Sequence, residues 1–374
     1  LPAVVRPYLM GRDIVQHREE RFVIDFYDTD PDDSRKKHGK LWNRVVRLVK
    51  PERELNNRDS RRKNWWHSGE PGGKLRTAIN GTKRYIATCR TAVHRLFVFV
   101  GAETIPDTKV VVIASESAIV LGVLSSRVHQ VWADRTKAML EDRPTYNHTE
   151  SFTPFPFPDA SKPQSAKIAK LGEAVDTHRK GRQRADSELA LTDIYNVLAK
   201  LRANTALTPD DESVRDRALV DTLRDLHDEL DAAVLDAYGW PANLTDDEII
   251  TRLVALNAER AAEEAKGKVR WLRPAFQAPD EVAKAPQPTE TKTTKPKVTK
   301  AAARPKWPKA DPPKYAVVLD VLASLDGSAP LDDILGAIDG PDTNDVVNVL
   351  ACLAAAQRTA FVDDGDGPRW ILRA

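Results

Sequence analysis

The chain has 374 residues, of which 41% are hydrophobic and 30% are charged, and its formal net charge at pH 7 is +2. This length and composition predict a globular protein of two or three domains. No apolar run approaches the roughly 20 residues that span a bilayer, which excludes a membrane-spanning protein. Two distant cysteines, Cys89 and Cys352, support neither a disulfide framework nor a thiolate zinc site. We therefore expect a cytoplasmic location and no membrane partner.

The first segment, residues 1–159, predicts an α+β domain of mixed sheet and helix. Four short runs are rich in Val, Ile, Phe and Tyr and are bounded by Pro, Asp or Gly, as strands are: 21–28, 84–90, 94–101 and 108–115. Two further runs, 40–66 and 117–135, have the apolar spacing of helices. The chain opens at Leu1 rather than Met within sequence of folded character. We expect it to be a piece of a longer protein, or one lacking its N-terminal part.

Charge is distributed unevenly along the chain. Residues 35–95 hold 18 Lys or Arg against four Asp or Glu, a local net charge of +14. Residues 315–374 hold three Arg against ten Asp, a local net charge of −7. An excess of this size predicts a polyanion-binding surface in the basic block. The alternative is a solvated cationic helix whose tryptophans lie in the core.

Residues 146–159 carry an unusual aromatic and proline-rich stretch, "YNHTESFTPFPFPD", with three Phe and three Pro between Phe152 and Pro158. Prolines cannot donate to a central strand, but they restrict φ and lower the entropy of an extended segment. The stretch therefore predicts a packed, extended seam. Its Phe rings are expected to lie between the sheet domain and the helices that follow.

The next segments predict three further parts. Residues 160–277 read as a helical bundle, since leucines recur at steps of four and three in one segment and Thr245 with Glu248 forms a capping box in the next; the leucines are Leu219, Leu223, Leu226 and Leu230. Residues 278–314 are mostly Pro, Lys, Thr and Ala, which predicts a flexible basic linker. Residues 315–374 predict three short helices and a hairpin around Gly365 and Gly367, the order of a winged-helix-like module.

Two strings carry a resemblance to a known family. They are "VVVIASESAIVLGVLSSRVHQVWA" and "PTYNHTESFTPFPFPD", and helical strings such as "LTDIYNVLAKLR" and "LHDELDAAVLDAYGWP" add to them. The chain resembles the target-recognition domain of MmeI-like adenine-specific DNA methyltransferases, of the type IIG restriction–modification group and its relatives in phage defence. The likeness covers about residues 1–277, and residues 315–374 match only as an accessory tail of some members.

The resemblance implies sequence recognition of double-stranded DNA rather than catalysis by this chain. In the family, an upstream domain binds S-adenosylmethionine and methylates the exocyclic amine of adenine, and some members carry an N-terminal nuclease. The glycine-rich cofactor loop and the Asn-Pro-Pro-aromatic motif are both missing here. "GEPGGK" (69–74) lacks a preceding apolar strand, and "ADPPKY" (310–315) has Lys314 where the aromatic belongs.

We therefore expect no cofactor and no metal in this chain, and no activity from it alone. No Ser-His-Asp set, paired-carboxylate site or His/Cys metal cluster stands out, so no catalytic residue is predicted. S-adenosylmethionine is expected in an upstream methyltransferase domain or a separate catalytic subunit. This chain would dock on duplex DNA, read a short sequence and present the adenine for flipping.

Fourteen cations are the candidate DNA-binding residues. Phosphate contacts are expected from the basic block, including Lys36, Lys37, Arg61, Arg62, Lys63, Lys74, Arg76 and Lys83. Base-edge contacts are expected from some of Arg84, Arg90, Arg95, Arg135, Lys137 and Arg143. For those beyond residue 126, a plain surface role is an equal alternative.

Two other functions remain open from the sequence. The chain would act as a non-catalytic protein-interaction scaffold if its basic surface binds an acidic partner, and the acidic final module would mask that surface if it folds back on it. A full enzyme with a cryptic site would bind S-adenosylmethionine itself. Truncation of residues 278–374 and calorimetry with S-adenosylmethionine discriminate these alternatives.

Overall fold

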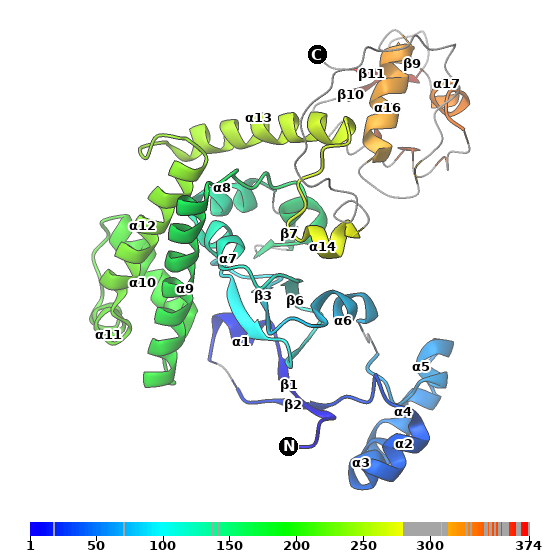
Figure 1. Ribbon diagram of the computed structural model, residues 1–374, viewed down its shortest axis with the longest axis vertical. Coiled ribbons are helices and arrows are strands. Elements are labelled where there is room, and N and C mark those ends of the chain that lie inside the picture. The colour runs from blue at the N-terminus through cyan, green and yellow to red at the C-terminus, as the bar shows by residue number, and fades with distance from the viewer. Residues whose placement is uncertain are drawn as a thin grey trace, which may run out of the picture. The chain divides into compact units, whose positions relative to one another are not determined.

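The computed structural model (Figure 1) describes most of the chain. The described residues are 1–17, 19–69, 72–136, 138–140, 143–279, 308, 313–325, 328–329, 331–339, 343, 346–347, 349–350, 353, 359–363 and 368–372. They form two compact units, Leu1–Arg260 and Ala261–Ala374.

An antiparallel sheet lies at the centre of the first unit. Its middle strand, β3 (Arg84–Cys89), pairs with β4 (Val98–Gly101) on one side and β6 (Val110–Ile113) on the other. One sheet face packs on α7 (Ala118–Ser125), and the other packs on α1 (Arg12–Val15) and α6 (Gly73–Ile79). Because both faces are covered, nearly every residue of these strands is buried, which explains their uninterrupted apolar character. Three of the four predicted strands are confirmed here, although β4 begins four residues later than expected.

Smaller pairings surround this sheet. The strand β1 (Val5–Leu9) pairs antiparallel with β2 (Phe22–Ile24) and parallel with β5 (Ile105–Pro106). The hairpin of β7 (Ala138–Leu140) and β8 (Arg143–Thr145) follows α8 (Arg127–Thr136). The predicted strand at 21–28 shrinks to the three residues of β2, and the predicted helix at 117–135 is broken at Ser126 into α7 and α8.

The segment predicted as one helix over 40–66 is instead part of a cluster of four short helices. They are α2 (Pro31–Lys37), α3 (Gly39–Leu48), α4 (Lys50–Glu54) and α5 (Asp59–Lys63), drawn in blue in Figure 1. Pro51 suits the first turn of a new helix, where its missing N–H is no loss, but not a helix interior. We call residues 31–69 the basic lobe. Its core is aromatic, with the Trp42 ring 5.5 Å from Phe26 and 5.2 Å from Trp65.

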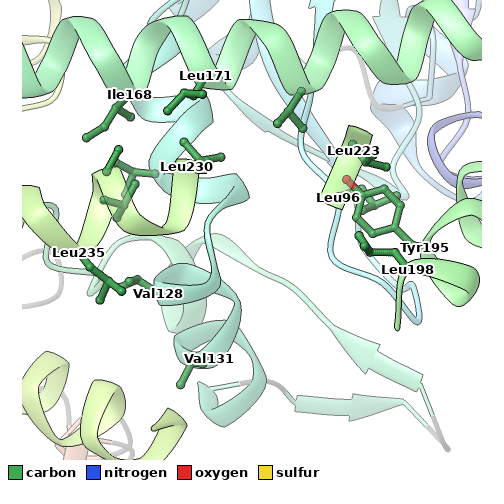
Figure 2. Close-up of a cluster of buried hydrophobic side chains, with 14 of the residues drawn as sticks. Leu96, Val128, Val131, Ile168, Leu171, Tyr195, Leu198, Leu223, Leu230 and Leu235 are labelled. Atoms are coloured by element: carbon green, nitrogen blue, oxygen red, sulfur yellow. The ribbon is translucent and has the colours of Figure 1, made fainter. Parts of the chain in front are cut away.

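The predicted helical segment consists of helices as expected. They are α9 (Lys162–Ala185), α10 (Leu191–Arg202), α11 (Pro209–Ala218), α12 (Val220–Ala237), α13 (Asp246–Ala265) and α14 (Pro274–Gln277). Figure 2 shows Ile168 and Leu171 of α9 pointing toward Leu230 of α12 in the main core. One leucine departs from the predicted repeat. Leu219 is 46% exposed and sits at φ +50° between α11 and α12, so it ends one helix instead of packing in the next.

The sheet-bearing segment and the helices pack within one compact unit. Two glycines allow α7 and α9 to approach closely. A Cβ on Gly172 would lie 2.8 Å from the Ala118 carbonyl oxygen and 3.0 Å from Gly122 Cα, and one on Gly122 would lie 2.9 Å from the Ile168 carbonyl oxygen. Close backbone approach of this kind requires glycine. The predicted domain boundary after residue 159 stays a prediction.

The aromatic seam is confirmed. Phe155 is 4% exposed within the helical core, and Phe157 packs against both that core and the core of the sheet. The two rings meet edge to face at 5.0 Å. The Tyr238 hydroxyl donates to the Pro156 carbonyl at 2.8 Å. A carbonyl oxygen of the proline-rich segment is therefore a hydrogen-bond acceptor for the residue that ends α12. The seam therefore fixes the sheet against the helices.

The second unit contains α16 (Pro313–Ser324), α17 (Leu331–Gly336) and a sheet of β9 (Ser328–Ala329), β10 (Thr359–Asp363) and β11 (Pro368–Leu372). The antiparallel β10–β11 pair agrees with the predicted hairpin, and β9 adds a third strand. A winged-helix-like module stays a prediction. Most of the predicted linker 278–314, and both hairpin glycines, lie outside the described residues. None of the helices in the described ranges is both long and apolar enough to cross a membrane.

Candidate nucleic-acid interface

The basic lobe carries the largest local excess of cations. Its residues 31–69 hold twelve Lys or Arg against five Asp or Glu. Lys36, Arg62 and Lys63 are exposed on α2 and α5. Lys37 pairs with Asp33 at 3.2 Å, and Arg62 pairs with Asp59. Exposed pairs such as these contribute about 0–1 kcal/mol in water, so they leave the cations able to exchange a carboxylate for a phosphate.

Further exposed cations of the lobe were not among the predicted residues. They are Arg35, Lys40, Arg44, Arg47 and Arg58. The signal that would have found them is the same charge excess, read over the whole lobe instead of residue by residue. Arg61, which was predicted, lies half-buried on α5.

Arg76 lies in an ion-pair network rather than on an open surface. Its guanidinium donates to both oxygens of Asp25, at 2.8 and 3.0 Å, and stands over the Tyr27 ring at 4.3 Å. Asp25 also pairs with Arg6 at 3.4 Å. The Arg76 side chain is 15% exposed. Arg76 therefore ties α6 to the chain that leads into the basic lobe, and its phosphate contact stays a prediction, while its neighbour Lys74 is exposed.

Arg84 is likewise partnered within the protein. Its guanidinium lies 3.5 Å from the centre of the Phe99 ring, pairs with Glu173 of α9 and donates to the Glu116 carbonyl at 3.2 Å. These contacts join the first residue of β3 to the helical part. The adjacent Lys83 is exposed, so it is the better candidate for an anion contact at this end of the strand.

Arg90 occupies the opposite end of β3 and is exposed. Its carbonyl accepts a hydrogen bond from the Tyr146 N–H at 2.8 Å, and the next residue, Thr91, bridges Thr145. The chain ends of β3 and β8 are therefore fastened together. This brings Arg90 to the edge formed by the β7–β8 hairpin, which begins its second strand at Arg143. Lys137 lies outside the described residues.

Arg95 is the most deeply buried of the predicted base contacts whose exposure is described. It is 8% exposed, donates to the carbonyls of Cys89 and Pro144, and lies 5.0 Å from the Tyr146 ring. Burial lowers the pKa of this guanidinium. A buried cation held by carbonyl oxygens cannot reach a base edge without dismantling the structure around it. Arg95 therefore braces the edge that carries Arg90.

The motif residues form a rigid backing behind this edge. His129 Nε2 lies 2.9 Å from the Tyr146 hydroxyl, and Phe155 meets the His129 ring at 4.4 Å. Burial, helped by the charge of Arg95, lowers the pKa of His129 to about 3, so this histidine is neutral. Trp132 Nε1 donates to the Ser151 carbonyl at 3.0 Å. The two strings that carry the resemblance thus meet in one buried cluster.

Arg135 lies at the end of α8 and its side chain is 58% exposed. It pairs with Asp247 of α13 at 2.6 Å, and Arg127 pairs with Asp246 at 2.5 Å. Arg135 stays accessible in spite of its partner. The predicted cations in the described residues therefore lie in the basic lobe, at the two ends of β3, on α6, at the start of β8 and at the end of α8, and only Arg76 and Arg95 are held among partners inside the protein.

Comparisons with known proteins show which family and which solved structure the chain is similar to. The family model of the MmeI target recognition domain matches residues 2–159. A solved structure of the type IIL restriction–modification enzyme MmeI in complex with DNA is similar, with a TM-score of 0.52 and 17% sequence identity. The match covers 70% of this chain and 31% of that one, so this chain spans about a third of its length. A comparison with curated proteins found no match.

The expectation that residues 1–159 hold no methyltransferase cofactor stays a prediction. Apart from the two-residue pairing of β1 with β5, the described sheets are antiparallel, whereas a nucleotide-type cofactor site needs a parallel strand, loop and helix. The glycine-rich segment at 69–74 leads into α6, a helix of seven residues, with Gly72 at φ +68°. Within the described ranges, no group of His, Cys, Asp and Glu has the arrangement of a metal site.

Proposed function

We propose that this chain is the DNA sequence-reading part of an MmeI-like restriction–modification enzyme, with double-stranded DNA as its partner. The observation that carries the proposal is the family match over residues 2–159. It is supported by the exposed cations of the basic lobe and of the Arg90 edge, because a duplex presents one negative charge for about every 1.7 Å of its axis.

Two groups of cations have different roles in this proposal. The basic lobe contacts phosphates, which position the protein but carry little sequence information. Arg90, Arg135 and the β7–β8 hairpin contact base edges, where arginine recognises guanine through two hydrogen bonds. The buried cluster of Tyr146, His129 and Phe155 suits this role, because base reading requires side chains held in fixed register.

The methyl-transfer chemistry is proposed for a domain or subunit outside these residues. That partner would bind S-adenosylmethionine and methylate the N6 amine of an adenine, which this chain would help to expose by flipping. The support is the resemblance of the two motif strings to adenine-specific methyltransferases, together with the 31% share of MmeI that this chain spans. A role in phage defence belongs to the same proposal.

Binding selection from a pool of randomised duplexes tests the proposal. The full chain is expected to enrich one short sequence motif, with an affinity that falls steeply between low and moderate salt. Binding without an enriched motif would contradict sequence reading. Absence of binding to any duplex at low salt would contradict DNA as the partner and would favour the scaffold whose basic surface meets an acidic protein.

A further inference from the structure

The turn that joins α4 to α5 in the basic lobe (Figure 1) carries an unusually exposed leucine. Leu55 is 86% exposed, more than any other large apolar side chain of the described residues except that of Leu1. It therefore adds almost nothing to the core of the lobe, which Phe26 and Trp42 occupy. A single exposed leucine is common on protein surfaces, so its surroundings decide whether it has a partner.

The backbone of this turn is fixed by Asn56, the residue after the leucine. The Asn56 N–H donates to the Arg53 carbonyl at 3.0 Å, and the Asn56 Oδ1 accepts from the Arg58 N–H at 3.0 Å. Arg62 Nη1 of α5 donates to the Asn56 carbonyl oxygen at 2.7 Å. Asparagine side chains close turns in this way. Leu55 therefore stands exposed on a rigid turn rather than on a loose loop.

The charge around the turn favours a polyanion over an apolar protein surface as its partner. Residues 50–63 hold six Lys or Arg against three Asp or Glu. Two of the three carboxylates, Glu54 and Asp59, are paired with cations. Within three positions of Leu55 on either side, every residue is polar or charged. The core of a protein interface is depleted of charge, whereas the apolar base stack of a duplex lies between two rows of phosphates.

We infer that Leu55 inserts from the minor groove between two stacked base pairs of the duplex, an inference that rests on the proposed function. Leucine is one of the side chains that enter base steps in this way, and its insertion partly unstacks the bases and kinks the duplex. Asn57, exposed beside it, suits the acceptors on the floor of that groove. Because pyrimidine–purine steps kink most easily, Leu55 adds a sequence preference to a lobe whose cations contact phosphates.

Bending of a short duplex by the full chain tests the inference, measured as energy transfer between dyes on the two ends of the duplex. The duplex carries the motif enriched by the binding selection, and the protein is present at saturation. The wild type is expected to kink the duplex by about 20° or more and so to raise the transfer efficiency. Leu55→Ala should lose at least half of that rise. Equal rises in the two proteins would overturn the inference, as would a duplex that stays straight with the wild type.

Leu48→Ala is the matched control. Leu48 is 54% exposed in the same lobe, but it lies at the end of α3 and not on the turn, so its replacement should leave the bending at the wild-type level. Because both leucines are exposed, both variants are expected to melt within about 2 °C of the wild type. A loss of bending in both variants would assign the effect to the lobe as a whole and overturn the role of Leu55.

Repeating the binding selection with the variants separates this inference from the proposed function. The wild type and Leu48→Ala are expected to enrich a motif that contains a pyrimidine–purine step. Leu55→Ala should lose the preference at that step and keep the rest of the motif. The same motif in all three proteins would leave sequence reading intact and overturn the insertion of Leu55. Absence of any enriched motif with the wild type would overturn both proposals.

Discussion

Two neighbouring arginines within residues 2–159 lie in opposite environments. Arg90 is exposed at the end of β3, and Arg95 is buried five residues later beneath the Tyr146 ring. The sequence alone predicts the same role for both, a contact to a base edge, because both flank strands in a basic segment. Their environments instead predict that one affects recognition and the other affects folding.

Replacing each by alanine separates these roles. Arg95→Ala leaves buried carbonyls without their donor and is expected to lower the free energy of unfolding by about 3 kcal/mol or more. Arg90→Ala should change stability by about 0.5 kcal/mol or less but cost about 1–3 kcal/mol of discrimination between cognate and non-cognate duplexes. Urea unfolding and anisotropy titrations measure the two effects. A large stability loss in Arg90→Ala would contradict its placement.

Asp231 on α12 gives the protein a pH-dependent stability. Its carboxylate accepts a hydrogen bond from the Arg127 N–H at 2.7 Å, but burial dominates and raises its pKa to about 6 from an ordinary 3.8. The folded state therefore holds a proton between about pH 4 and pH 6 that the unfolded state has released. The contribution of protonated Asp231 to the free energy of unfolding is complete below pH 4. It is lost as the pH rises through 6, by up to about 3 kcal/mol.

The substitution Asp231→Asn removes this titration while keeping an oxygen acceptor for Arg127. The free energy of unfolding of this variant relative to wild type is expected to rise between pH 4 and pH 7 by up to about 3 kcal/mol. Urea unfolding at each pH measures this difference. The difference between the two proteins isolates Asp231 from carboxylates whose pKa shifts in the opposite direction. Asp211 is one of them, because hydrogen bonds from Lys200 and Thr208 lower its pKa to about 2. A difference that is flat with pH would contradict the burial of Asp231.

At the scale of elements, the contact of α7 with α9 fixes the sheet to the helices. Gly172→Ala would place its Cβ 2.8 Å from the Ala118 carbonyl oxygen, so the helices must separate, at an expected cost of about 1–3 kcal/mol. Gly181→Ala on the same helix meets nothing within 4 Å and should stabilise by about 0.5–1 kcal/mol through helix propensity. Urea unfolding of the pair gives the comparison; two changes of the same sign would argue against close helix packing.

Elements whose pattern matched a regular period were predictable from sequence. The strands at 84–90 and 108–115 and the seam at 152–158 lie where their composition placed them. The basic lobe was not, because 40–66 was predicted as one helix across Pro51, and proline suits only the first turn of a new helix. The short strands β1, β5 and β7 have two to five residues, too few for any period to register.

For the whole molecule, the division of cations predicts a division of their effects on DNA binding. Replacing Lys36, Arg62 and Lys63 together by alanine should reduce the slope of log K against log salt by about 0.9 for each phosphate that is no longer neutralised. The preferred sequence should stay unchanged, because phosphate contacts do not read bases. Anisotropy titrations at several salt concentrations, with the motif found by selection, measure both.

A matched control replaces the same number of exposed lysines elsewhere. Lys162, Lys167 and Lys170 lie on α9 and are exposed, so their joint replacement by alanine alters net charge by the same amount without touching the lobe. Its salt slope should remain that of the wild type. Equal slopes in the two triple variants would show that net charge, and not the basic lobe, governs the affinity.

The sequence by itself determined the resemblance of residues 2–159 to the MmeI target recognition domain, the helical nature of 160–277, the seam and the presence of an excess of cations, because motif strings, periodicity and charge are local properties. Only the tertiary structure decided which cations are available. Arg76 and Arg84 meet Asp25 and Glu173, which lie 51 and 89 residues away, and Arg95 is closed in by residues of β3 and of the chain around Tyr146. Burial and ion pairing depend on such distant partners, and no local reading of the chain contains them.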